Sequence, residues 1–225
     1  MKIASLKPTQ WFPGQNVSVK PHLRGWIHLV AAPLSLAASI VLTCLAPTGA
    51  TKGGSAIYLA ASLILFGISA LSPRFYWSPR WEVVWNRLDH SNIFLLIAGT
   101  YTPLSIAILP HDQAVTILSI VWGGALLGIL LNLFWPTAPR WLATLIYVAL
   151  GWVALWYLPQ FWSLGGAVIV WLLLAGGILY TIGAVVYATK KPDLSPRWFG
   201  FHEIFHLCTV LAWACHCVAV YLAVL

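Results

Sequence analysis

Charged residues are scarce in this sequence, and their scarcity narrows the class of protein. Only 8% of the 225 residues are Asp, Glu, Lys or Arg, while 60% are hydrophobic; a soluble globular domain averages about 25% charged residues. Four charge-free runs, at residues 25–51, 53–73, 113–139 and 141–189, reach or exceed the roughly 20 apolar residues that one bilayer crossing needs. The sequence therefore excludes a soluble globular protein and predicts an integral membrane protein.

Several common functional motifs are also missing. The sequence has no phosphate-binding loop, no nucleotide-binding fingerprint and no Ser/His/Asp order of a catalytic triad. Its four cysteines lie within or at the ends of apolar segments, where cysteine acts as a small hydrophobe, so we expect no disulfide framework. The apolar segment after residue 25 is about 20 residues long, more than the 7–15 of a signal-peptide core, and we expect it to be a retained first span.

The polar breaks between apolar segments divide the chain into candidate helices. The run at residues 141–189 is too long for one span, and Pro159 with Gly165 and Gly166 supplies a break within it. We therefore predict an all-α seven-transmembrane helix bundle over residues 26–225, after an N-terminal segment at residues 1–25. The seven predicted helices are 26–46, 55–72, 91–109, 114–135, 141–158, 166–188 and 203–224.

Basic residues predict the orientation of this bundle. An odd number of spans places the two termini on opposite sides, and eleven of the twelve Lys and Arg residues then fall on the side of the N-terminus. Only Lys52 falls on the other. By the positive-inside rule, the N-terminus is cytoplasmic and the C-terminus lies outside. Because the basic residues sit in short loops beside the spans, we expect membrane lipids rather than nucleic acid as their partners.

Ionisable residues inside or at the edge of a span are costly and mark candidate functional positions. The predicted topology brings most of them to the cytoplasmic side. There they begin or end four helices that are distant in sequence, so we expect them to form one site. The residues at this depth are His28, Ser69, Asp89, His90, His202 and His206.

Residues 202–206, HEIFH, match the HExxH signature of zinc proteases. The i, i+4 spacing places His202 and His206 on one face of a helix, about 6 Å apart, where both can bind one metal ion. No acidic residue follows His206, and the next histidine, His216, lies about 15 Å further along the helix axis. A third ligand must therefore come from upstream, with Asp89 and His90 as the candidates.

Glu203 within this motif has two interpretations. It could serve as the general base of a metalloprotease. The favoured interpretation is a charge in the first turn of the last helix, where the helix dipole stabilises it. In the third and sixth predicted helices, small residues such as Gly99 and Gly183 predict close helix packing.

Five stretches of the sequence resemble the hemolysin III family, the bacterial branch of the progestin and adipoQ receptor superfamily. They cover nearly the whole chain, and those of the third and seventh helices match almost letter for letter. The stretches are "LRGWIHLVAAPLSLAA" (23–38), "RLDHSNIFLLIAGTYTPL" (87–104), "YVALGW" (147–152), "GGILYTIGAVVYATKKPD" (176–193) and "WFGFHEIFHL" (198–207).

This resemblance implies seven helices, a cytoplasmic N-terminus, a location in the bacterial inner membrane and a zinc site on the cytoplasmic side. In the family, the ligands are a histidine that ends helix two in an SxxxH motif and the two histidines of HxxxH, with an aspartate nearby at the start of helix three. The corresponding residues are Ser69 with Pro73, His202 with His206, and Asp89.

Pro73 is a departure from the family pattern, because proline has no side-chain donor atom for a metal. Zinc sites typically have at least three protein ligands. Either Asp89 or His90 completes the shell, or the metal is weakly held or absent.

The family pattern also resembles that of alkaline ceramidases, which implies zinc-dependent hydrolysis of a lipid amide or ester, with Asp89 positioning the attacking water and Ser69 beside it. Relatives that lack glutamate at the second position of the motif make Glu203 dispensable as a base. The alternatives are a non-enzymatic receptor or regulator of membrane fluidity with a degenerate metal site, then a pore-forming cytolysin, then an intramembrane protease.

Overall fold

The computed structural model describes residues 23, 25–47, 49–72, 74–75, 77–135, 140–195 and 198–225, without the side chains of Pro79 and Arg140. Within these residues the protein is helical, and the only β-type pairing is an isolated bridge between Ser195 and Phe199. The helical elements are α2 (Trp26–Leu45), α3 (Gly49–Leu71), α4 (Pro79–Ile108), α5 (His111–Phe134), α6 (Arg140–Gly151), a 3₁₀ segment (Trp152–Tyr157), α7 (Leu158–Gln160), a π-helical segment (Phe161–Gly165), α8 (Ala167–Thr189) and α9 (Phe201–Val224).

Among the residues that the structure describes, seven helical stretches are long and apolar enough to cross a membrane, which confirms the predicted number of spans. The fifth is Trp141–Gly165, and each of the others belongs to a single helix. Helices suit a bilayer because each backbone N–H and C=O forms its hydrogen bond within the same segment. The hydrocarbon core of the bilayer contains no water that could form these bonds instead.

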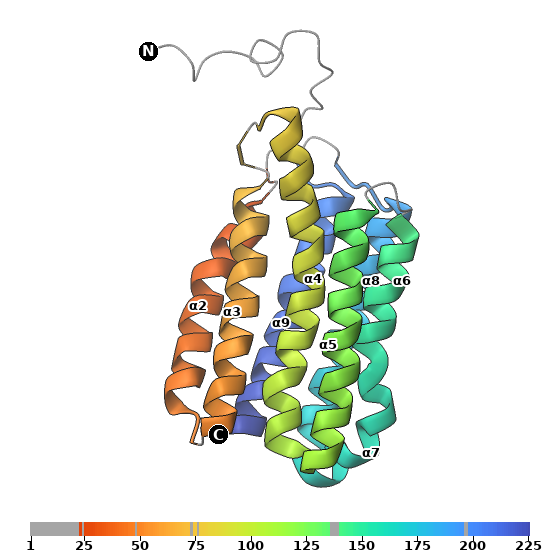
Figure 1. The fold of residues 1–225 in the computed structure, drawn as a ribbon. Coiled ribbons are helices and arrows are strands. Elements are labelled where there is room, and N and C mark those ends of the chain that lie inside the picture. The colour runs from red at the N-terminus through yellow and green to blue at the C-terminus, as the bar shows by residue number, and fades with distance from the viewer. Residues whose placement is uncertain are drawn as a thin grey trace.

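The helices form one bundle in which α4, α3 and α9 are the most enclosed (Figure 1). The most apolar window of α4 is 67% buried, that of α3 50% and that of α9 44%, against 22–28% for the other four spans. In Figure 1, α2 and α3 lie on one side of the bundle and α6 and α8 on the other, with α9 between them. Residues on α9 can therefore reach both halves.

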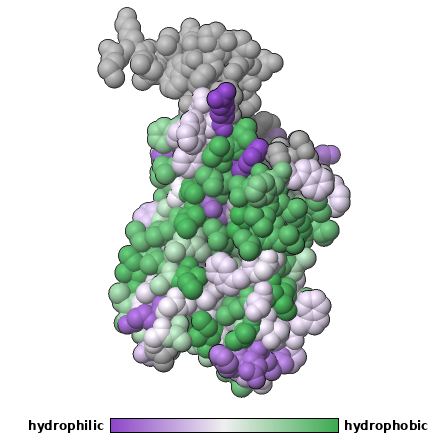
Figure 2. Space-filling view, in the orientation of Figure 1, coloured by the Kyte–Doolittle hydropathy of each residue, from purple (hydrophilic) through white to green (hydrophobic). Residues whose placement is uncertain are grey.

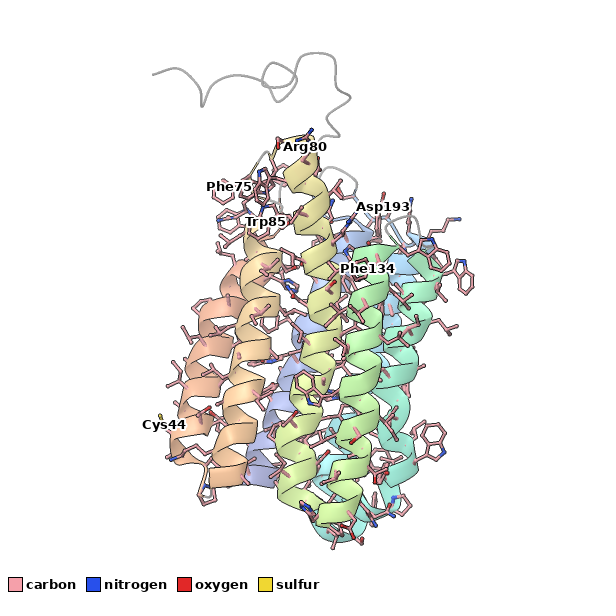
Figure 3. The ribbon with its side chains drawn as sticks, viewed as in Figure 1. Cys44, Phe75, Arg80, Trp85, Phe134 and Asp193 are labelled. Carbon is pink, nitrogen blue, oxygen red and sulfur yellow. The ribbon has the colours of Figure 1, made fainter. Side chains whose placement is uncertain are left out.

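Helix α4 begins twelve residues earlier than the predicted third helix, which we had placed at 91–109. Pro79 at its first turn has no N–H to satisfy and its φ suits a helix start, and the following residues include good helix formers despite their charges. The first turns therefore extend beyond the rest of the bundle, with Arg80 near the tip (Figures 1 and 3). The prediction was wrong because polarity there marks the end of the apolar zone, not the end of the helix.

The fifth span is also longer than predicted and is not a regular α-helix. The prediction ended it at residue 158, whereas 3₁₀ and π-helical turns carry the chain on to Gly165. The reversal comes at Gly166, whose φ of 89° is open to glycine at little cost. The hydroxyl of Tyr101 spans the irregular backbone, donating to the carbonyl of Gly151 at 2.7 Å and accepting from the N–H of Ala154 at 2.8 Å.

Two glycines confirm the predicted close helix packing. A Cβ on Gly99 of α4 would lie 2.6 Å from the Cβ of Ala61 on α3, and one on Gly183 of α8 would lie 2.9 Å from the Cβ of Cys208 on α9. Both distances are too short for carbon atoms in contact. These two helix pairs therefore depend on the absence of a side chain.

Hydrophobic residues cover most of the helical body, and hydrophilic ones gather toward its ends (Figure 2). The C-terminal ends of α3, α5 and α8 and the starts of α4, α6 and α9 lie at the upper end in Figure 1, and the C-terminus lies at the lower end. Arg80 and Asp193 are labelled at the upper end in Figure 3. Which end faces the cytoplasm stays a prediction.

Candidate functional site: a histidine cluster

Three histidines from α2 and α9 meet near the upper end of the bundle. The ring of His28 lies face to face with that of His206, with centroids 3.9 Å apart and planes inclined by only 2°. The ring of His202 is 4.4 Å from that of His206, centroid to centroid. His28 and His206 are each only 2% exposed. We call His28, His202 and His206 the histidine cluster.

The apolar wall of the histidine cluster comes from α3. Phe66 places its ring edge-on to His28, with centroids 5.2 Å apart, and also packs edge-on against Trp213 of α9 at 5.5 Å. The indole N–H of Trp213 donates to the hydroxyl of Ser62 at 3.0 Å, which ties α9 to α3. Ser69 is buried and lies three residues after Phe66, on the same face of α3.

His90 of α4 is linked to the cluster through Tyr187 of α8. Its Nδ1 donates to the backbone carbonyl of Asn86 at 2.7 Å, and its Nε2 therefore accepts from the hydroxyl of Tyr187 in the neutral tautomer. The ring of Tyr187 is in turn 6.0 Å from that of His202. A metal ion bound by His90 would have to replace one of these two hydrogen bonds.

Asp89 precedes His90 on α4, and its side chain is partly buried. The helices that carry the predicted site residues pack together in one bundle. These residues are Asp89 on α4, Ser69 on α3, and His202 and His206 on α9, and their roles stay predictions. Pro73, the position of the missing family histidine, lies outside the described residues.

Glu203 supports the start of α9 in this structure. It is 2% exposed, and its Oε2 accepts from the backbone N–H of Gly200 at 2.9 Å. Asp193 adds a second carboxylate there, accepting from the N–H of Phe201 at 3.2 Å. Helix N-termini favour such negative charges and acceptors. The arrangement favours the structural interpretation of Glu203 over that of a protease base.

The histidine cluster does not present converging metal ligands in the arrangement seen. Within the described ranges, no group of three or more His, Cys, Asp or Glu side chains is placed to hold a metal ion. The cause is the face-to-face contact of His28 and His206, because imidazole lone pairs lie in the ring plane and parallel planes direct them side by side.

The donor atoms themselves are nevertheless suited to zinc. Neither Nδ1 nor Nε2 of His28 has a hydrogen-bond partner of normal geometry, although both atoms are buried. A buried polar atom without a partner is costly and often marks an ion or water site. Imidazole nitrogen is a preferred zinc ligand, and sets of three histidines occur in catalytic zinc sites. The residues present therefore fit zinc once one ring turns.

A largely apolar cavity lies within the bundle, and the histidine cluster is not part of its lining. Its volume is about 90 Å³, and α4, α6, α8 and α9 supply most of its wall. Phe205, Thr209 and His216 line it. His216 bonds through Nε2 to the carbonyl of Leu173 at 3.2 Å. The structure thus keeps His216 apart from the cluster, in agreement with the expectation from its distance along the helix.

His28 is the residue whose place sequence reasoning left open. Its depth predicted that it would lie near the other polar residues, but we assigned the possible third ligand to Asp89 or His90. His28 meets His206, which lies 178 positions later in the sequence. Whether two such distant side chains face each other depends on how their helices pack, and the sequence alone gives no direct signal of that packing.

Comparison with known proteins gives one consistent result. The profile of the family described as "Haemolysin-III related" matches residues 17–217. Hemolysin-3 of Bacillus cereus is 34% identical over 188 residues, which are 80% of this chain and 80% of that protein. The Hemolysin-3 homolog of Bacillus subtilis (strain 168) is 40% identical over 116 residues, 51% of this chain and 54% of that protein. The family match contains the whole histidine cluster.

Proposed function

Because this chain belongs to the haemolysin-III related family and is a multi-pass membrane protein, we propose that it is a zinc-dependent hydrolase of the bacterial inner membrane that cleaves an amide or ester bond of a lipid. The observation that carries the proposal is the histidine cluster. Burying the imidazoles of His28 and His206, with that of His202 partly buried beside them, inside membrane-spanning helices is expensive, and a shared ligand would offset that cost.

His202 and His206 would hold the zinc ion, with a third ligand from a neighbouring helix. When bound, zinc would polarise the carbonyl of the substrate and acidify a water molecule. This is the chemistry that hydrolysis of a lipid amide or ester requires.

The roles of the other residues follow from their positions. Asp89 lies beside His90 on α4, where its carboxylate would orient a water molecule and accept its proton. Ser69, buried on the helix face that carries Phe66, would donate a hydrogen bond to the substrate. Tyr187 fixes the ring of His90 and so limits the freedom of this end of α4.

The substrate would reach the cluster from the bilayer, since α2 and α9 expose large apolar side chains such as Leu34 and Leu211. The cavity beyond Phe205 is smaller than the roughly 150 Å³ apolar cavity that admits a benzene molecule. It can therefore receive only a short part of an acyl chain as it stands. Helices must separate, or the chain must lie along the outer surface of the bundle.

The direct test is turnover of a panel of fluorescent lipid amides and lipid esters by purified protein in lipid nanodiscs. Asp89→Asn should lower turnover by at least about 100-fold if its carboxylate accepts the proton. Asp112→Asn is the matched control, because Asp112 is exposed in the first turn of α5 at the opposite end of the bundle. Equal loss in both variants, or no turnover by the unchanged protein with zinc bound, contradicts the proposal.

A second function is favoured by a different observation. The parallel rings of His28 and His206 and the proline at position 73 fit a protein that has kept the fold and given up the metal. Such a protein would act without catalysis, as a receptor or as a regulator of membrane fluidity. Zinc-free protein that still changes lipid order when added to vesicles would support this second function over the hydrolase.

A further inference from the structure

We infer that His28 is the third metal ligand of this chain, taking the place of the histidine that proline replaces at position 73. This inference rests on the proposed function only in assuming that zinc binds to His202 and His206. The third ligand would then lie in the first turn of α2, whereas the family pattern places it at the end of the second span.

The first argument is position. His28 is 2% exposed and stacks directly on His206, so it is already in contact with one predicted ligand. The contact described for His90 in this direction is with Tyr187, whose ring lies 6.0 Å from that of His202. Of His28 and His90, His28 is therefore the nearer to the predicted ligands of α9.

The second argument is the state of its nitrogen atoms. Both ring nitrogens of His28 are buried without a hydrogen-bond partner of normal geometry. Those of His90 contact the carbonyl of Asn86 and the hydroxyl of Tyr187. Coordination by His28 would therefore satisfy a buried polar atom, whereas coordination by His90 would break a hydrogen bond to form one new contact.

The third argument is the composition of α3 at this depth. The side chain that α3 presents to His28 is Phe66, which has no donor atom. Phe66 meets the imidazole edge-on, and an aromatic edge allows the neighbouring ring to turn within its pocket more readily than a hydrogen bond would. Rotation of His28 about its Cβ–Cγ bond would end the parallel stacking and direct a nitrogen lone pair toward the other two histidines.

The test is the zinc content of the purified full-length protein, measured by inductively coupled plasma mass spectrometry after equilibration with zinc and removal of the excess. We expect about one zinc ion per chain in the unchanged protein. His28→Ala should lose at least about 10-fold in zinc affinity, and His28→Asn should lose it too while keeping a polar side chain of similar shape. His111→Ala is the matched control, because His111 is exposed at the opposite end of the bundle.

A double variant makes the inference specific. Pro73→His added to His28→Ala should restore zinc binding, because it returns a histidine to the position that the family uses. The visible absorption of the Co²⁺-loaded protein gives a second measure, since it responds to the number of nitrogen ligands and does not depend on turnover.

The outcomes separate this inference from the proposed function. Zinc that stays bound in both His28 variants overturns the role of His28 and leaves the hydrolase proposal standing. An unchanged protein that binds neither zinc nor Co²⁺, while Pro73→His binds both, overturns the role of His28 and the hydrolase together. If His28→Ala fails to fold, His28→Asn decides the question.

Discussion

His90 of α4 and Tyr187 of α8 are joined through the ring Nε2 and the phenol hydroxyl, although 97 positions separate them in the sequence. This contact links the predicted start of the third span to the end of the sixth. It also fixes the tautomer of His90, because Nδ1 must carry the proton that it donates to Asn86.

Replacing Tyr187 with phenylalanine tests this link. Tyr187→Phe leaves the His90 Nε2 without its donor in a partly buried place, and we expect the free energy of unfolding to fall by about 1–3 kcal/mol. Thermal unfolding in detergent would measure it. Zinc content should stay the same if His28 is the third ligand, and a gain or a loss of zinc would show that His90 takes part in holding the metal.

Substitutions of Glu203 test whether it caps α9 or acts as a general base. In Glu203→Gln the amide oxygen can still accept from the Gly200 N–H, so we expect turnover to change by less than about threefold, since no proton transfer is lost. Glu203→Ala removes the acceptor and should cost about 1 kcal/mol of stability. A fall of about 100-fold or more in Glu203→Gln with unchanged stability would return Glu203 to the role of catalytic base.

The approach of α4 to α3 at Gly99 can be tested with a matched pair of glycines. Gly99→Ala would bring its Cβ within 2.6 Å of that of Ala61, and we expect a loss of about 1–3 kcal/mol from overpacking. A Cβ on Gly67 of α3 meets nothing within 4 Å, so Gly67→Ala should be neutral or stabilising. The double variant Ala61→Gly/Gly99→Ala should recover part of the loss, and equal effects at both glycines would refute the packing argument.

Tyr101 forms hydrogen bonds with the backbone at the irregular part of the fifth span. Tyr101→Phe would leave the Ala154 N–H and the Gly151 carbonyl without their bridge, and in an apolar setting each lost partner costs about 1–3 kcal/mol. Hydrogen exchange followed by mass spectrometry should show faster exchange over residues 152–165 than in the unchanged protein. Unaltered exchange there would mean that the 3₁₀ and π-helical turns hold without the tyrosine.

Orientation can be measured with cysteines at opposite ends of the bundle. In a background without native cysteines, Arg80→Cys on the extended start of α4 should react with a membrane-impermeant maleimide only in inside-out vesicles. Asp112→Cys at the start of α5 should react only in right-side-out vesicles or intact spheroplasts. The reverse pattern would invert the topology that the basic residues predict.

Hydropathy sufficed to predict the number and order of the spans, because every helix that crosses a membrane needs about 20 apolar residues. It failed at Pro79, where the helix continues through charged residues beyond the apolar zone. It failed again after Gly151, because the residues of the 3₁₀ and π-helical turns are as apolar as those of the preceding α-helix. The structure was needed to show that the hydroxyl of Tyr101 forms hydrogen bonds with this irregular backbone.

The candidate site was predictable in depth but not in contact. Positions along each span showed that His28, Ser69, Asp89 and the HxxxH pair belong to one end of the bundle. Which of them meet depends on how each helix is rotated about its own axis, and small residues such as Gly99 and Gly183 set that rotation through packing. The stacking of His28 on His206 is a product of this rotation.

That stacking also gives the protein an internal reporter. Two aromatic rings held face to face at 3.9 Å each lie in the magnetic shielding region of the other, so the carbon-bound ring protons of both imidazoles should resonate upfield of those of the exposed His111. Any event that turns one ring, including capture of an ion, would move these signals downfield together. A single nuclear magnetic resonance spectrum of selectively labelled histidine could therefore follow the state of the cluster in a native-like bilayer.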